Sequence, residues 1–271
     1  MILFDGLVFP VFTYIIRGNC RRYSQITFPA IRRRPLMFGA PPPTQFDIRF
    51  VLFRIPVTVS PFFWILACIL GYMWSKHGSG IDAFAFIAVV LAVFLSILVH
   101  EMGHALVVRY VFGAIPVIIL QGLGGITIYD RYYYYRNPGS WGQIFISFAG
   151  SLAGFMLSAL CLLLVMFVFA EQSEDQEPNY LSFFLIAMFV IGVFWGILNL
   201  MPVYPLDGGQ IFREICLMIS PRNGMNASLV VSAAVGIMIT LLSLGIGEPL
   251  IALMFGVLAY QSIQKLQTRR F

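Results

Sequence analysis

Long apolar stretches separated by short polar segments dominate the chain after about residue 56. Each stretch approaches the roughly 20 residues that an α-helix needs to cross the hydrocarbon core of a bilayer. The chain lacks the apolar–polar alternation that is typical of barrel strands. The pattern therefore predicts an all-α polytopic membrane protein with about six transmembrane helices, at residues 57–75, 83–108, 143–170, 181–202, 227–246 and 249–264.

The composition supports this class, because the chain is 59% hydrophobic and 11% charged, with a mean hydropathy of +0.87. About 25% of the residues in a soluble domain are charged, so these values exclude an ordinary soluble protein. The four cysteines fall in separate segments and have no metal-ligand spacing. They predict neither a disulfide framework nor a thiolate zinc site.

The basic residues divide the chain into regions. Residues 1–55 carry several arginines and are interpreted as a basic arm on the membrane surface. Anionic head groups attract each such residue by about 1 kcal/mol. Residues 56–265 then form the predicted six-helix core, and residues 266–271 form a short cytoplasmic tail.

The same charges orient the core in the membrane. If the amino terminus is cytoplasmic, every basic residue except Lys76 lies inside and the acidic loop at 171–179 lies outside. This distribution follows the positive-inside rule, so we expect both termini in the cytoplasm. The compact, charge-poor exterior favours a prokaryotic inner membrane. Because the basic residues adjoin apolar spans, we expect membrane lipids as partners and no nucleic acid.

The second predicted span ends in His100-Glu101-Met102-Gly103-His104, an H-E-x-x-H motif. In a helix, His100 and His104 lie on one face and Glu101 lies beside them. This arrangement suits two imidazole ligands on one zinc ion and a carboxylate that takes a proton from water. Ionisable groups at membrane depth are costly and usually functional, although a hydrogen-bonded pair of core histidines would give the same spacing.

A catalytic zinc site takes three protein ligands and leaves one position open. The only other histidine, His77, falls on the outer side of the predicted topology, whereas Asp207 falls on the same side as the motif. Pro202 and Pro205 cannot continue a regular helix, so we expect irregular backbone before Asp207. The alternatives are that Asp207 only caps a helix end, or that Glu214 is the third ligand.

Two glycines follow that acid, in Asn199-Leu-Met-Pro-Val-Tyr-Pro-Leu-Asp207-Gly208-Gly209. Together with H-E-x-x-H in an earlier helix, this segment resembles the site-2 protease family of intramembrane zinc metalloproteases. The resemblance runs from about Arg54 to the last span and is closest to compact members without a PDZ or CBS domain. It implies that His100, His104 and Asp207 bind one zinc ion and that Glu101 is the catalytic carboxylate. It also implies that Asn199 contacts the substrate main chain or the developing oxyanion.

The segment Gln121-Gly122-Leu123-Gly124-Gly125 lies between two β-prone stretches and resembles the membrane-dipping β-hairpin of that family. Such a hairpin could present an edge strand to an extended substrate. Gly122, Gly124 and Gly125 are therefore candidate substrate-binding residues. The alternative for these glycines is an ordinary tight turn.

The motifs and the resemblance predict a zinc metalloendopeptidase. The resemblance implies that it cleaves single-pass transmembrane proteins, as in regulated intramembrane proteolysis. The alternative is a catalytically inactive zinc-binding membrane scaffold that binds transmembrane helices. Glu101 favours the enzyme, because a structural zinc site does not need a base beside its ligands. A metal transporter is less consistent with the sequence, since two histidines and one acid do not line a path across a bilayer.

Overall fold

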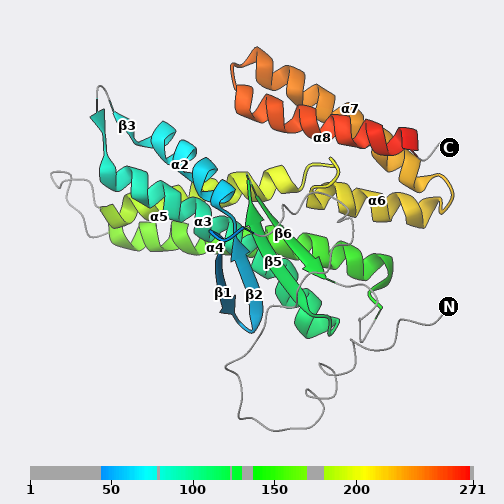
Figure 1. Cartoon of the computed structure of the whole chain (residues 1–271), viewed down its shortest axis with the longest axis horizontal. Coiled ribbons are helices and arrows are strands. Elements are labelled where there is room, and N and C mark those ends of the chain that lie inside the picture. The colour runs from blue at the N-terminus through cyan, green and yellow to red at the C-terminus, as the bar shows by residue number, and fades with distance from the viewer. Residues whose placement is uncertain (1–43, 78–79, 123, 130–136, 170–179, 269–271) are drawn as a thin grey trace, which may run out of the picture. The chain divides into compact units, whose positions relative to one another are not determined.

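The computed structural model describes residues 44–77, 80–122, 124–129, 137–169 and 180–268 (Figure 1). The basic arm before residue 44 and the acidic loop at 171–179 lie outside the described residues. The helices are α2 (Pro61–Ser75), α3 (Ala83–Leu106), α4 (Gly139–Phe169), α5 (Tyr180–Asn199), α6 (Asp207–Ile219), α7 (Gly224–Gly245) and α8 (Pro249–Thr268). A π-helical turn, η1 (Val107–Val111), extends α3.

Five of the described helices, α3 with η1, α4, α5, α7 and α8, are long and apolar enough to cross a membrane. Their outer faces carry large exposed apolar side chains such as Phe167, Leu241 and Leu253, which is typical of contact with lipid. Helix α2, which lies at the first predicted span, has 15 residues and a length of about 22 Å. The hydrocarbon core of a bilayer is about 30 Å thick. The predicted count of six spans is therefore not confirmed.

The first predicted span, at 57–75, is wrong at its start because its first residues form a strand. The segment Ile55–Val59 (IPVTV) alternates between fully and partly buried side chains, as a strand covered on one face does. Its β-branched residues favour extended backbone, and Pro61 then occupies the first position of α2. The strand and the helix were merged because both are apolar and adjacent.

A four-stranded sheet adds to the all-α architecture that the sequence predicted. Its order is β1 (Ile48–Leu52), β2 (Ile55–Val59), β5 (Pro116–Gln121) and β6 (Gly124–Tyr129). The β1–β2 and β5–β6 pairs are antiparallel, and β2 pairs with β5 in parallel. Residues 48–52, predicted to belong to the surface arm, are instead the first strand of this sheet. Two further short strands, β3 (Lys76–His77) and β4 (Gly80–Ile81), pair between α2 and α3.

Helix α3 is central and packs against α2, α4, α5 and the β5–β6 pair (Figure 1). The helix begins after Asp82, whose carboxylate accepts hydrogen bonds from the main-chain N–H groups of Phe84 and Ala85. Its carboxyl-terminal half is buried almost completely, including the whole H-E-x-x-H motif. The fold therefore brings the motif into the interior, where α4 and strand β6 contact it.

The chain leaves α5 at Asn199, follows irregular backbone over residues 200–206 and enters α6 at Asp207. The sequence predicted the break but placed the end of the helix at 202, and it did not predict α6. Because α6 follows at once, Asp207 lies in the first turn of a new helix. Gly208 and Gly209 are needed at this junction, since a Cβ on Gly208 would collide with the carbonyl oxygen of Leu200.

Candidate metal centre

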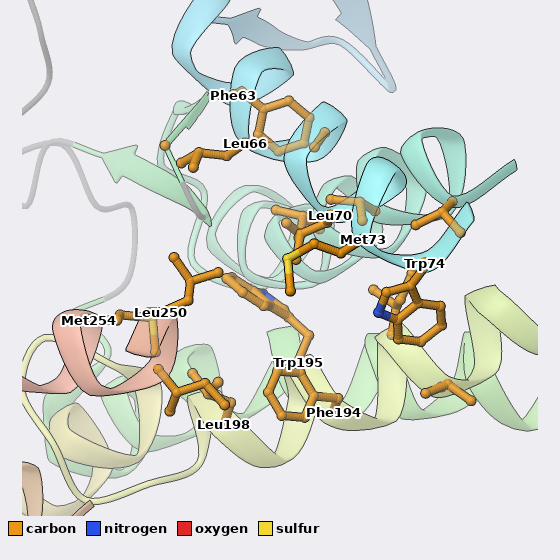
Figure 2. Close-up of a pocket in the computed structure, with 18 of the residues that line it drawn as sticks. Phe63, Leu66, Leu70, Met73, Trp74, Phe194, Trp195, Leu198, Leu250 and Met254 are labelled. Carbon is orange, nitrogen blue, oxygen red and sulfur yellow. The ribbon is translucent and has the colours of Figure 1, made fainter. Parts of the chain in front are cut away.

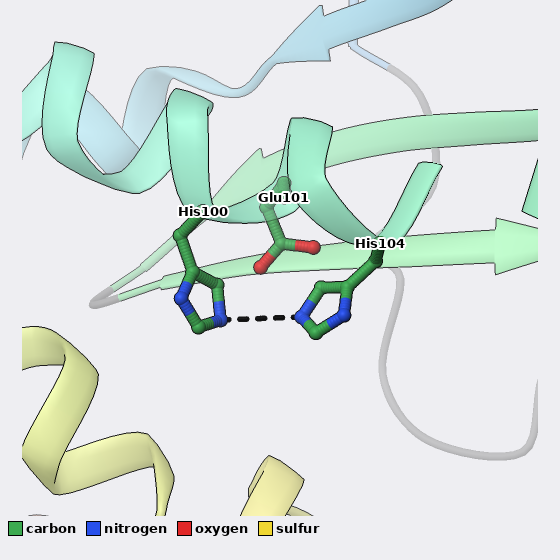
Figure 3. Close-up of side chains that lie close together, drawn as sticks. All are labelled: His100, Glu101 and His104. Atoms are coloured by element: carbon green, nitrogen blue, oxygen red, sulfur yellow. Dashed lines mark hydrogen bonds between the residues drawn. The ribbon is translucent and has the colours of Figure 1, made fainter. Parts of the chain in front are cut away.

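The two histidines of the motif lie one helical turn apart on α3, with their rings turned to the same side (Figure 3). Their Nε2 atoms are 3.2 Å apart, and His100 and His104 are 2% and 7% exposed. The Nδ1 atom of His104 lies 2.7 Å from the carbonyl oxygen of Ile146 on α4. If Nδ1 carries the proton and donates it to this carbonyl, the Nε2 lone pair of His104 is available to a metal.

Asp207 completes a triangle of donor atoms with the two imidazoles. Its Oδ2 lies 3.0 Å from His100 Nε2 and 3.2 Å from His104 Nε2. Zinc bonds to nitrogen and oxygen are about 2.0–2.2 Å long, so two ligand atoms of a tetrahedral site are separated by about 3.3 Å. The three donor atoms therefore converge at nearly the spacing that one zinc ion requires.

The carboxylate of Asp207 has an unusual environment for a buried group. Among the described residues, its Oδ2 has no hydrogen-bond partner despite its two close imidazoles. Burial alone would raise the pKa of this carboxyl, but the facing histidines outweigh it and lower the pKa to about 2. A cation between the three donor atoms would satisfy the orphaned Oδ2 of Asp207. These observations fit a metal ligand.

Glu101 lies between the two histidine rings and points to the same side of α3 (Figure 3). It is 5% exposed, and one donor atom from each of His100, Glu101 and His104 lies within 4.8 Å of the others. This grouping would also allow Glu101 to be a ligand. Asp207 fits the third position better, because its oxygen is 3.0–3.2 Å from both imidazoles, whereas Glu101 Oε2 accepts a hydrogen bond from Thr127.

Glycines on two neighbouring elements make room for these side chains. A Cβ on Gly150 of α4 would collide with the ring of His104, and a Cβ on Gly125 of β6 would collide with the side chain of Glu101. Gly103 on α3 lies against the Ala149 carbonyl of α4. The motif helix can therefore approach both α4 and the sheet closely only because these positions lack side chains.

The structure places the three glycines predicted to bind substrate in and beside the β5–β6 turn. Gly122 has φ of +55°, a conformation that favours glycine and forms the turn. Gly124 begins β6 against the indole of Trp195, and Gly125 follows against Glu101. β6 is the last strand in the sheet order. Gly125 thus reaches the candidate site, although the predicted depth of this hairpin in a membrane stays a prediction.

Asn199 is the last residue of α5 and is 8% exposed. Its side-chain Nδ2 donates a hydrogen bond of 3.0 Å to the Trp195 carbonyl, one helical turn earlier. An amide nitrogen carries two hydrogens, so the second can serve another acceptor. The sequence-based role of Asn199 toward substrate stays a prediction.

The other candidate ligands do not join the cluster. His77 lies in the short strand β3, just before the start of α3, whereas His100 and His104 lie in the carboxyl-terminal half of that helix. Glu214 on α6 accepts a hydrogen bond of 2.7 Å from Arg213, with which it forms an ion pair. Of the acids weighed from the sequence, only Asp207 faces the two imidazoles within ion-pairing distance among the described residues.

An apolar cavity of about 330 Å³ lies between α2, α3, α5 and α8 (Figure 2). Trp195 and Met73 point toward one another across it, from α5 and α2. Ile97, which also lines the cavity, lies about one helical turn before His100. Leu198, another lining residue, directly precedes Asn199. The residues that line the cavity include none of the candidate metal ligands and not Glu101.

Comparisons with known proteins point to metalloproteases. The model of peptidase family M50 matches residues 168–243, which include Asn199 and Asp207. A zinc metalloprotease of Methanocaldococcus jannaschii is 28% identical over 157 residues, which are 58% of this chain and 42% of that protein. A Synechocystis protein named as a candidate zinc metalloprotease is 27% identical over 207 residues, which are 73% of this chain and 50% of that protein. The chain thus spans about half the length of these relatives.

A search of solved structures finds the site-2 protease of Methanocaldococcus jannaschii, with a TM-score of 0.57 and 22% identity. The match covers 82% of this chain and 95% of the solved chain. The resemblance inferred from the motifs is therefore confirmed: part of the chain matches peptidase family M50, and the chain is similar to proteins named as zinc metalloproteases and has the fold of a site-2 protease.

Proposed function

We propose that this protein is an intramembrane zinc metalloendopeptidase that hydrolyses peptide bonds in transmembrane segments of other proteins. The observation that carries the proposal is the convergence of His100, His104 and Asp207 on one point, with Glu101 beside them. The names of the relatives and the site-2 protease fold support the same activity. The long apolar helices that surround the site favour a substrate that is itself in the membrane.

The three converging residues would hold one zinc ion. When bound, the ion would supply a Lewis acid that makes water a stronger nucleophile and polarises the scissile carbonyl. Glu101 would take the proton from the attacking water and return it to the amine that leaves. The contact with the Ile146 carbonyl would orient His104, and the start of α6 would orient Asp207.

Asn199 would donate its second N–H to the substrate main chain or to the oxygen that becomes negatively charged during attack. Its position at the end of α5 supports this role, because the Trp195 carbonyl already orients its amide. Loss of one such donor typically lowers the rate by about 10²–10³-fold.

The substrate would be a single-pass transmembrane protein. A helix hides its carbonyls in hydrogen bonds, so a stretch of substrate must become extended before cleavage. β6 could pair with that stretch, since it ends the sheet and its residues 124–125 lie between Trp195 and Glu101. The neighbouring cavity would receive apolar side chains, because apolar residues of four helices line most of it.

The protein would reside in a prokaryotic inner membrane, with both termini in the cytoplasm and lipid around the helices. The charge distribution of the sequence supports this orientation, since every basic residue except Lys76 would lie inside.

The second candidate function is a zinc-binding scaffold that holds transmembrane helices without cutting them. Substitution of Glu101 by Gln separates the two functions, because it removes the base and leaves the three proposed ligands. We expect purified Glu101→Gln protein to bind as much zinc as the wild type and to cleave no transmembrane reporter. If the wild type also cleaves none of a panel of reporters, the scaffold is favoured. Undiminished cleavage by the variant would refute the role of Glu101.

A further inference from the structure

Thr127 connects the edge strand of the sheet to the proposed catalytic base. It lies in β6, and its side-chain hydroxyl donates a hydrogen bond of 2.7 Å to Glu101 Oε2. The same hydroxyl lies 3.2 Å from the main-chain oxygen of Glu101. A hydroxyl has one proton to donate, and the shorter contact to a charged oxygen is the stronger of the two.

Gly125 acts with Thr127 on the same side of the strand. Side chains two residues apart in a strand project from the same face, so positions 125 and 127 both face α3. At position 125 the missing side chain leaves space that the Glu101 side chain fills. At position 127 the hydroxyl binds the end of that side chain. One position therefore admits the carboxylate and the other sets its orientation.

We propose that Thr127 is a positioning residue that holds the Glu101 carboxylate in the orientation required for proton transfer. The proposal rests on the function proposed above. With Oε2 bound to Thr127, Oε1 is the oxygen left to accept the proton, since an ionised carboxylate offers two acceptor oxygens. A carboxylate without this hydrogen bond could rotate about its side-chain torsions, and fewer molecules would present the base correctly.

The location of Thr127 gives this contact a second consequence. If an extended substrate pairs with β6, the strand that holds the substrate also holds the base. The distance between the scissile bond and Glu101 is then set within one strand rather than across the helix bundle. Because main-chain atoms would make the strand pairing, the Thr127 side chain acts on turnover and not on substrate binding.

A purely structural role would have Thr127 only fasten β6 to the end of α3 through the main-chain oxygen of Glu101. Two substitutions distinguish the roles. Thr127→Val keeps the shape of the side chain and removes the hydroxyl, whereas Thr127→Ser keeps the hydroxyl. Thr58→Val is the matched control, since it makes the same chemical change on β2 of the same sheet, away from the base.

The test uses full-length protein in detergent micelles and a single-pass transmembrane reporter that the wild type cleaves. We expect Thr127→Val to lower kcat by about 10–100-fold, the usual effect of losing a partner that orients a group in a metal site. KM, zinc content and Tm should stay near wild-type values, and Thr127→Ser should restore most of the turnover. A structure of Thr127→Val should show the Glu101 carboxylate rotated from its wild-type position.

Several results would overturn the inference and leave the proposed function intact. They are a wild-type kcat for Thr127→Val, an equal loss in Thr58→Val, or a rise in KM without a fall in kcat. A variant with lower Tm and no recovery in Thr127→Ser would show a structural role only. If the wild type cleaves no reporter, the proposed function fails first, and an unmoved Glu101 in the Thr127→Val structure would still refute the positioning role by itself.

Discussion

The two halves of the candidate metal site are built in different ways. His100 and His104 come from one continuous helix, and their spacing follows from the helical repeat alone. Asp207 comes from the first turn of α6. The residues before it, 200–206, form neither a helix nor a strand. The histidine half is therefore set by local structure, and the aspartate half depends on whatever fixes residues 200–206.

Contacts from α7 and α8 fix those residues. The Tyr204 main-chain N–H donates to Ser232 Oγ of α7 at 2.7 Å, and Ser232 Oγ lies 2.8 Å from Ser262 Oγ of α8. Both serines are essentially fully buried. Val203 is also fully buried and belongs to an apolar cluster with Phe255 of α8. The position of Asp207 thus depends on two helices that contribute no residue to the site.

This difference shows that substitutions in distant helices can affect one ligand of a metal site, here Asp207, more than the others. Changes within α3 act directly on the ligands that they touch. Changes in α7 or α8 can reach the site only through residues 200–206, and they should act on Asp207 before the histidines.

The largest expected effect comes from removing the aspartate half altogether. Asp207→Ala leaves two imidazoles, which are too few ligands for a stable catalytic zinc site. We expect the purified variant to lose most of its zinc and all measurable cleavage, as judged by metal analysis and a reporter assay. Glu214→Ala, on the same helix, should keep its zinc, since Glu214 pairs with Arg213. Loss of zinc in Glu214→Ala but not in Asp207→Ala would mean that Glu214, and not Asp207, is the third zinc ligand.

A smaller effect is expected when the histidine half is crowded from α4. Gly150→Ala would place a methyl group into the ring of His104. Overpacking of this kind typically costs about 1–3 kcal/mol, and here it should displace the ligand as well as destabilise the fold.

The matched control is Gly154→Ala, one turn along α4, where the nearest atom to a new Cβ would be the Gly192 carbonyl oxygen at 3.8 Å. Thermal unfolding and zinc titration of both variants measure the effect. Equal behaviour of the two would show that the close approach of Gly150 to His104 is not required.

The smallest expected effect tests the indirect support of the aspartate half. Ser232→Ala removes the hydroxyl that accepts a hydrogen bond from the Tyr204 main-chain N–H, and the loss of one hydrogen bond costs about 0.5–1.5 kcal/mol. We expect weaker zinc binding with little change in helix content. Ser228→Ala is the control on the same helix, because Ser228 donates to the Met225 carbonyl within α7. Unchanged zinc affinity in Ser232→Ala would mean that α7 does not position Asp207.

The same contrast explains how much the sequence could predict. The His100–His104 pair was found because a helical repeat relates residues that are near in the chain. Asp207 was found from Pro202, Pro205 and the two glycines, which mark irregular backbone and close approach. The structure then brings the three side chains together as that interpretation required.

Other features depended on contacts that no local pattern reveals. Most of strand β2 was read as the start of a helix, because residues 57–59 are mainly apolar and only Ser60 separates them from the apolar α2. Helix α6 was missed because it is short and amphipathic, so a search for long apolar stretches does not detect it. Thr127 and Gly150 gained their relevance only when the fold placed them against Glu101 and His104. The one indication in the sequence for Thr127 was its position two residues after Gly125, which places both on the same face of a strand.

X-ray absorption at the zinc edge of the purified wild-type protein tests the central claim most directly. The account predicts one zinc per chain, with two imidazole nitrogens and carboxylate oxygen at about 2.0–2.2 Å and no sulfur neighbour. In Asp207→Asn protein the zinc content or the number of oxygen neighbours should fall. Zinc that keeps the same neighbours in that variant, or that is bound through cysteine sulfur, would contradict the account.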